Sequence, residues 1–306
     1  MRISETYMAG LLAPASASAP APQRQQQRRC GREVARANEY KCVKAVAQFG
    51  HLRVAELARC VWPTARYGEQ LARRTIRRLT NAGLLLERRN ALGSKSVCLT
   101  RGGASWLELR GVPAQHTLEL TSVSGATFFH RTMATRYLIE RQTSGSQVAG
   151  EYLILRRDLP FSIDRLVKTM QKLPDGLVWH RNKLDSSISV ELVEQEAARK
   201  SRAELEKCLR ASEFVGAAIT ADGSVKLTGL IFVYDRALSH ARRILLAANS
   251  LWGNRTAAER ATLERRVKLV AVELRDPLVW VSSSATTLHD YRLKEGAWLA
   301  TITLAG

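Results

Sequence analysis

Four arginine side chains lie within six residues of the chain, where one helix would carry them all. They are Arg73, Arg74, Arg77 and Arg78. Between them the apolar residues Ala72, Ile76 and Leu79 recur at three- and four-residue steps, as on one face of a helix. Guanidinium groups this close repel one another unless phosphates or guanine edges neutralise them. The pattern predicts a helix that reads DNA, and a solvated basic surface helix is the alternative.

Carboxylates near the middle of the chain form a second group that could do chemistry. Asp175 precedes one apolar run, and Glu194 and Glu196 close another. Two carboxylates on adjacent strands, here Asp175 and Glu194, can hold a hard divalent cation that activates water against a phosphodiester. Alternation along a strand places Glu194 and Glu196 on the same face. Lys200 follows Glu196 by one helical turn and is the nearest candidate for a positive charge there.

The overall charge points to a polyanionic partner. The 306 residues include 47 Lys and Arg against 28 Asp and Glu, which gives a formal charge of +19. Residues 1–125 hold 20 of these basic side chains but only 8 of the acidic ones. Self-repulsion of this size opposes folding unless a polyanion or a spread-out distribution of the charge relieves it, and nucleic acid is the leading partner. No apolar run approaches a membrane span, and no secretion signal or CxxC pair is recognised, so we expect a cytoplasmic protein with reduced cysteines and no membrane partner.

The N-terminal part of the chain must position the arginines. Residues 1–35 are rich in Ala, Pro, Gln and Arg and predict a disordered basic arm. Hydrophobic periodicity and turn signals then predict six elements. These are helices at 37–50, 54–60 and 67–80, strands at 84–89 and 95–99, and a helix at 100–109 capped by Thr100.

This order of elements resembles a winged helix-turn-helix domain, here over residues 36–112. Asn81-Ala82-Gly83 before a leucine-rich strand, and Cys98-Leu99-Thr100-Arg101-Gly102-Gly103, are similar to the close of many such wings. The resemblance implies that the third helix enters the major groove of double-stranded DNA and that the wing lies along phosphates. The expected groove contacts are Arg73, Arg74 and Arg77, with Gln70 reading adenine; the expected phosphate contacts are Arg78, Arg88, Arg89 and Lys95.

Residues 126–306, after a linker at 113–125, predict a mixed α/β domain. Expected helices lie at 128–142, 198–210 and 238–251. Expected strands lie at 151–155, 175–179, 187–194, 227–234 and 268–273.

Two phrases of this second domain resemble the replication-relaxation and plasmid-mobilisation group of proteins. They are Pro174-Asp175-Gly176 and the run from Val193 to Arg202. In that group a winged helix precedes a restriction-endonuclease-like domain of the PD-(D/E)xK type, and His130 matches the group's histidine after the linker. The resemblance implies Asp175 and Glu194 as magnesium ligands and Glu196 and Lys200 as further catalytic positions, provided the domain is an active nuclease.

One departure from the family pattern argues against cleavage. An active nuclease of this type carries lysine where this chain has Glu196, and a third carboxylate would repel the negative charge that develops on a phosphate. Three interpretations follow: a nuclease-like scaffold that binds without cutting, a metal-dependent endonuclease with its lysine moved to Lys200, or no site at all. In the last, Asp175 is a turn former and the two glutamates face solvent on an edge strand.

We therefore expect a sequence-specific double-stranded DNA-binding protein of mobile DNA, acting in plasmid mobilisation, replication control or transcriptional regulation. It needs no cofactor unless the nuclease-like site is active with magnesium. The alternatives are a metal-dependent endonuclease and an adaptor that recruits a relaxase or polymerase. The sequence leaves open the DNA target, the choice between monomer and homodimer, and the role of residues 215–306.

Overall fold

The computed structural model describes residues 30–116, 123–196, 200–276 and 278–295. Residues 1–29 of the expected arm (1–35) and residues 117–122 of the expected linker (113–125) lie outside these ranges. The expectation of disorder is wrong for residues 31–35, which belong to the first helix. Among the described residues, no helix is both long and apolar enough to cross a lipid bilayer.

The N-terminal unit has the expected elements with one addition. They are α1 (Gly31–Phe49), β1 (His51–Arg53), α2 (Val54–Val61), α3 (Gly68–Asn81), β2 (Leu85–Arg89), β3 (Lys95–Leu99) and α4 (Arg101–Glu108). The short strand β1 was not expected; it pairs antiparallel with β3, which also pairs with β2, so the small sheet has the order β1-β3-β2. The Thr100 cap is confirmed, because its Oγ1 accepts a hydrogen bond from the Gly103 amide at 2.9 Å.

The rest of the described chain is mixed α/β, as expected. Its elements are α5 (Gly125–Thr143), β4 (Gln147–Gly150), α6 (Glu151–Leu155), α7 (Asp164–Met170), β5 (Gly176–Arg181), β6 (Ile188–Glu196), α8 (Arg202–Leu209), the 3-10 helix η2 (Arg210–Phe214), β7 (Val225–Asp235), α9 (His240–Leu251), α10 (Ala257–Arg265), β8 (Val267–Asp276) and β9 (Val279–Thr287). Residues 288–295 are also helical.

One expected strand is wrong. Residues 151–155 form the helix α6, and the strand that pairs with β5 is β4, immediately before it. Tyr-Leu-Ile-Leu is too short an apolar run for periodicity to separate strand from helix. The elements α7, η2, α10 and β9 and the helical residues 288–295 were not expected at all.

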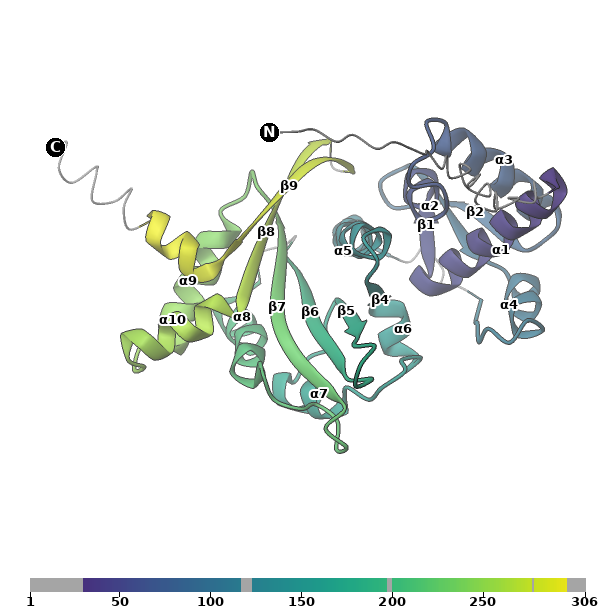
Figure 1. Ribbon diagram of the computed structural model, residues 1–306. Helices are drawn as coiled ribbons and strands as arrows, with labels where there is room; N and C mark the ends of the chain where they lie inside the picture. The colour runs from purple at the N-terminus through teal and green to yellow at the C-terminus, as the bar shows by residue number, and fades with distance from the viewer. Residues whose placement is uncertain (1–29, 117–122, 197–199, 277, 296–306) are drawn as a thin grey trace, which may run out of the picture.

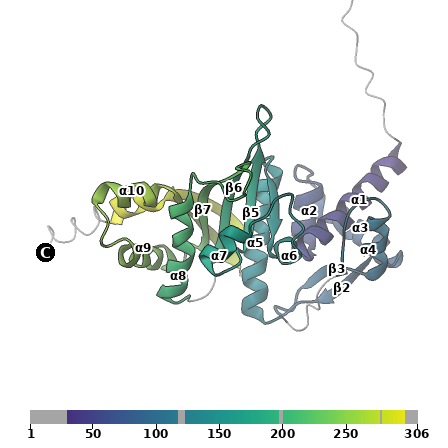
Figure 2. The same cartoon turned by 90° about the horizontal axis from the view of Figure 1, so that it is seen from below.

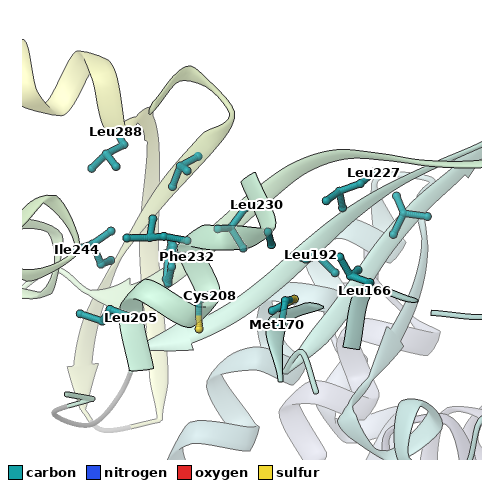
Figure 3. Packing of buried hydrophobic residues seen from close by; sticks show 14 of the residues in the cluster. Leu166, Met170, Leu192, Leu205, Cys208, Leu227, Leu230, Phe232, Ile244 and Leu288 are labelled. Atoms are coloured by element: carbon teal, nitrogen blue, oxygen red, sulfur yellow. The ribbon is translucent and has the colours of Figure 1, made fainter. Parts of the chain in front are cut away.

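Six strands form a twisted sheet in the order β4-β5-β6-β7-β8-β9. The three central strands β6, β7 and β8 run parallel, and the flanking pairs are antiparallel. Helices α7, α8 and α9 pack on one face of the sheet, where Leu192, Phe232 and Cys208 lie in one hydrophobic cluster (Figure 3). Helix α5 covers the other face (Figure 2).

The second hydrophobic cluster joins the N-terminal unit to the sheet. It includes Leu57 of α2 and Tyr137 of α5 together with Val193 and Val233 of the central strands. Contacts of α1 with β4 and α6, and of α2 with α5, belong to the same junction. The arginine helix α3 is therefore carried by a unit that shares its core with the large sheet (Figure 1).

Candidate functional site

The exposed side of α3 carries the arginines. Ala72, Thr75, Ile76 and Leu79 are buried against the N-terminal core, so the opposite side of the helix faces outward. Near the middle of that side lies Arg77. The exposed residues of α3 are Glu69, Gln70, Leu71, Arg73, Arg74, Arg77, Arg78 and Asn81.

The four arginines differ in the acidic partners they have. Arg73 pairs with Glu69 one turn earlier at 2.9 Å, and its side chain is 64% exposed. Arg78 pairs with Glu39 of α1 at 3.1 Å, so it points toward α1. Within the described ranges, Arg74 and Arg77 have no ion-pair partner. These two guanidinium groups are therefore the least neutralised by the protein itself.

A surface hollow joins α3 to the β2–β3 hairpin. It is lined by Arg73, Arg77 and Asn81 of the helix and by Glu87 and Lys95 of the hairpin. Lys95 pairs with Glu87 across the hairpin at 3.1 Å and remains 67% exposed. The two other basic residues of the hairpin, Arg88 and Arg89, are exposed as well. The hairpin thus continues the positively charged surface of α3.

The carboxylates come together at the ends of two paired strands. Gly176 of β5 lies opposite Val193 of β6, which brings Asp175 beside Glu194. Asp175 Oδ2 accepts a hydrogen bond from the Gln195 amide at 2.7 Å, and its Oδ1 lies 3.1 Å from His130 Nε2 on α5. The expected proximity of Asp175 and Glu194 is confirmed.

Lys200 reaches all three carboxylates from the segment before α8. Its Nζ lies 3.4 Å from Glu194 Oε2, 3.9 Å from Asp175 Oδ2 and 3.7 Å from Glu196 Oε2, and it donates to the Gln195 carbonyl at 2.9 Å. One ammonium group contacting both glutamates means that Glu194 and Glu196 share a face of β6, as alternation predicts.

Lys172 is a member of this cluster that sequence reasoning missed. Its ammonium group pairs with Glu194 and lies 4.0 Å from Asp175 Oδ2. It precedes Asp175 by three residues, and Gln171 before it adopts a positive φ of 53°. The only sequence signal for this contact is the pattern Lys-x-x-Asp. That pattern does not predict the bend at Gln171, which directs the Lys172 side chain toward Asp175 and Glu194.

The glutamates are buried, so the expectation of solvent-facing charges on an edge strand is wrong. Glu194 and Glu196 both have 0% relative exposure, and β6 is an interior strand. Burial raises the pKa of Glu196, and the nearby ammonium of Lys200 only partly opposes this. Although burial disfavours the charge on Lys172, Glu194 and then Asp175 raise its pKa above the usual range.

Asp175 and Cys208 also titrate away from their ordinary ranges. Burial opposes the charge on Asp175, but the hydrogen bond and charge of His130 and the two lysines hold its pKa well below normal. Burial, and next Glu194, raise the pKa of the Cys208 thiol, whose Sγ donates to Glu194 Oε2 at 3.3 Å. The cluster therefore keeps Asp175 ionised and Cys208 protonated.

These residues fit a divalent cation poorly as they are arranged. Buried oxygens are present: Glu194 Oε1 and both Glu196 oxygens lack hydrogen-bond partners among the described residues. However, two ammonium groups already lie within 4.0 Å of the oxygens of Asp175 and Glu194 that would coordinate it. In the described part of the chain, no three His, Cys, Asp or Glu side chains are grouped to hold a metal. Lys172 and Lys200 thus stand beside three carboxylates, and burial disfavours the ionised form of Glu196 by raising its pKa.

Comparison with protein-family models, curated proteins and solved structures gives no match to this chain.

Proposed function

We propose that the protein binds double-stranded DNA, with α3 in the major groove and the β2–β3 hairpin along the phosphates. The observation that carries the proposal is the hollow between these two elements, which Arg73, Arg77 and Lys95 line together. Arginine pairs with guanine edges in the major groove, and a basic hairpin beside the helix neutralises the flanking backbone. Arg74, exposed and unpaired within the described ranges, extends this surface.

The topology of the N-terminal unit supports a winged-helix interpretation. Three helices, a short strand after the first, and an antiparallel hairpin after the third follow the winged helix-turn-helix order. In such domains the third helix is the one that enters the groove. Arg78 has the weakest claim to a base contact because Glu39 draws it toward α1.

The second unit supports a nuclease-like scaffold that binds without cutting. Apart from α6, α7 and η2, which lie between them, helix α5, the antiparallel strands β4, β5 and β6, helix α8 and the parallel strand β7 are in the order expected from the resemblance to PD-(D/E)xK domains. The charge-balanced cluster of Asp175, Glu194, Lys172 and Lys200 favours a structural role over metal-dependent cleavage.

Fluorescence anisotropy with labelled duplex DNA tests the proposal. The probe is the DNA that flanks the gene of this protein. The triple variant Arg73→Ala, Arg74→Ala, Arg77→Ala should lose most of its binding, whereas Arg255→Ala, an exposed arginine on the α9–α10 connection, should bind normally. Undiminished binding by the triple variant would rule out α3 as the reading helix.

A metal-dependent endonuclease is the second candidate, and one observation favours it. Lys200 lies within 3.9 Å of both Asp175 and Glu194, where a lysine displaced from the position of Glu196 would act. Incubation of plasmid DNA with the protein and magnesium or manganese separates the two functions. Nicking that disappears in Asp175→Ala but persists in Lys183→Ala, an exposed lysine of the β5–β6 turn, would establish the enzyme.

The biological setting that we propose is mobile DNA, in plasmid mobilisation, replication control or transcription regulation in the cytoplasm. A DNase footprint on the DNA flanking the gene addresses this. A symmetric protected site would indicate a homodimeric repressor, and protection at a transfer origin would indicate mobilisation. An adaptor that recruits a relaxase would instead retain such a partner in a pull-down without protecting DNA.

A further inference from the structure

A large groove opens beside the N-terminal end of α3 and shares Arg73 with the hollow between α3 and the β2–β3 hairpin. Its volume is about 750 Å³. One wall is the connection from α2 to α3, and the other is the end of the β8–β9 hairpin, which Arg53 contacts by donating to the Leu278 carbonyl at 3.0 Å. Gln70 and Arg73 of α3 lie at its margin.

The lining of the groove is strongly basic. Five arginines line it against two glutamates. Arg59 and Arg136 share a single carboxylate, Glu140, at 2.8 and 2.9 Å. Arg136 Nε is buried and has no hydrogen-bond partner among the described residues. Arg66 has no acidic partner in the described ranges and lies 5.4 Å from the Tyr67 ring centroid. The groove therefore has positive charge that the protein itself leaves uncompensated.

Three aromatic residues also line the groove. Tyr67 is 56% exposed, and Trp62 and Trp280 are half-buried in the two walls. Rings and guanidinium planes together form surfaces on which bases stack, and the stacking tolerates any base sequence. Bases inside a duplex are already stacked on one another, so only an unpaired strand can use such rings.

The size of the groove also favours an unpaired strand over a duplex. Its volume is in the range of pockets that hold a small organic molecule. A double helix is far too large to enter a groove of that volume. We propose that this groove binds single-stranded DNA, with bases on Tyr67, Trp62 and Trp280 and phosphates on Arg66 and Arg136. Its position at the margin of α3 places this strand next to the duplex, a detail that rests on the proposed function.

Anisotropy with a short labelled single-stranded oligonucleotide of mixed sequence tests the groove. Tyr67→Ala and Arg66→Ala change exposed side chains, and each should weaken this binding about fivefold or more. The matched controls are Leu184→Ala and Arg255→Ala, which remove an exposed apolar side chain and an exposed arginine elsewhere. Both controls should bind as the unaltered protein does. Absence of single-strand binding, or equal binding by all variants, would overturn the proposal.

The same variants measured on blunt duplex DNA separate this inference from duplex binding. Tyr67→Ala should affect the single strand much more than the duplex, and Arg77→Ala, which does not line the groove, should do the reverse. Equal losses for Tyr67→Ala on both ligands would make the groove part of the duplex footprint and refute the inference. If Arg77→Ala leaves duplex binding intact while Tyr67→Ala abolishes single-strand binding, the duplex proposal fails and the groove stands.

Photo-crosslinking gives a direct second readout on the full chain. A single-stranded oligonucleotide carrying bromodeoxyuridine should crosslink to the peptides that contain Trp62 and Tyr67, or Trp280. Crosslinks confined to α3 and the β2–β3 hairpin would contradict the assignment.

Discussion

Lys200 Nζ lies 3.4 Å from Glu194 Oε2, and Lys172 pairs with the same oxygen. Lys172 precedes Glu194 in the sequence, whereas Lys200 follows it. Glu194 is fully buried, and these two ammonium groups and the Cys208 thiol are the partners of its Oε2. The two ammonium groups lie against the carboxylate oxygens that a metal ion would have to coordinate.

Glu194→Gln and Glu196→Gln should have opposite effects on stability. Removing the Glu194 charge leaves two lysines without their closest partner, and we expect a loss of about 3–5 kcal/mol in the free energy of unfolding. Burial raises the Glu196 pKa, which means that its ionised form is disfavoured in the folded state. The neutral glutamine should therefore cost nothing or stabilise by about 1 kcal/mol. Urea unfolding at neutral pH measures both, and a large loss for Glu196→Gln would show that its charge is needed.

His51 should make the protein less stable in mild acid. Burial, then Arg131 and Arg53, lower its pKa from 6.5 to about 4. Because the unfolded chain binds the proton more readily, stability is complete above pH 6.5 and declines as the pH falls toward 4, by about 3 kcal/mol at most. The ring stacks on Phe128 at 5.2 Å, so His51→Phe keeps the packing without the titration. Urea unfolding between these pH values should show a smaller decline for that variant.

Arg77→Ala and Lys95→Ala should weaken duplex binding in different ways. Arg77 lies near the middle of the exposed side of α3, so its loss should cost about 1–3 kcal/mol on the specific site and relax discrimination between sequences. Lys95 lies on the β2–β3 hairpin, and its loss should weaken binding to all sequences alike and reduce the slope of log K against log salt by about 1. Titrations at several salt concentrations distinguish the two, and identical salt slopes for Lys95→Ala and the unaltered protein would exclude a phosphate contact.

Gly103→Ala should destabilise the N-terminal unit. An added Cβ would lie 2.2 Å from the Leu84 carbonyl oxygen, which belongs to the backbone and cannot yield without shifting the chain before β2. We expect a loss of about 2–3 kcal/mol. At Gly31, also in a helix, an added Cβ meets nothing within 4 Å. Thermal unfolding should therefore show no loss for Gly31→Ala, and an equal loss at both positions would refute the steric argument.

Sequence patterns sufficed where the local signal was long and regular. The periodicity of α3, the Thr100 cap and the apolar strand β7 all identified their elements, and alternation along β6 placed Glu194 and Glu196 together. They failed where structure depends on distant contacts. Residues 151–155 pack as a helix against the N-terminal unit, and Lys172 reaches Glu194 only because of the bend at Gln171.

The hydrophobic cluster shared between the N-terminal unit and the large sheet has a mechanical consequence. Leu57 and Val193 belong to the same hydrophobic cluster, so α3 cannot rotate relative to the large sheet without disrupting the packing of that cluster. A DNA duplex bound by α3 would therefore have one fixed orientation relative to Asp175 and its neighbours. A fragment of residues 36–112 alone would expose the apolar surface that packs on the large sheet. Aggregation of that fragment would therefore reflect the loss of this packing and would not argue against DNA binding by the full chain.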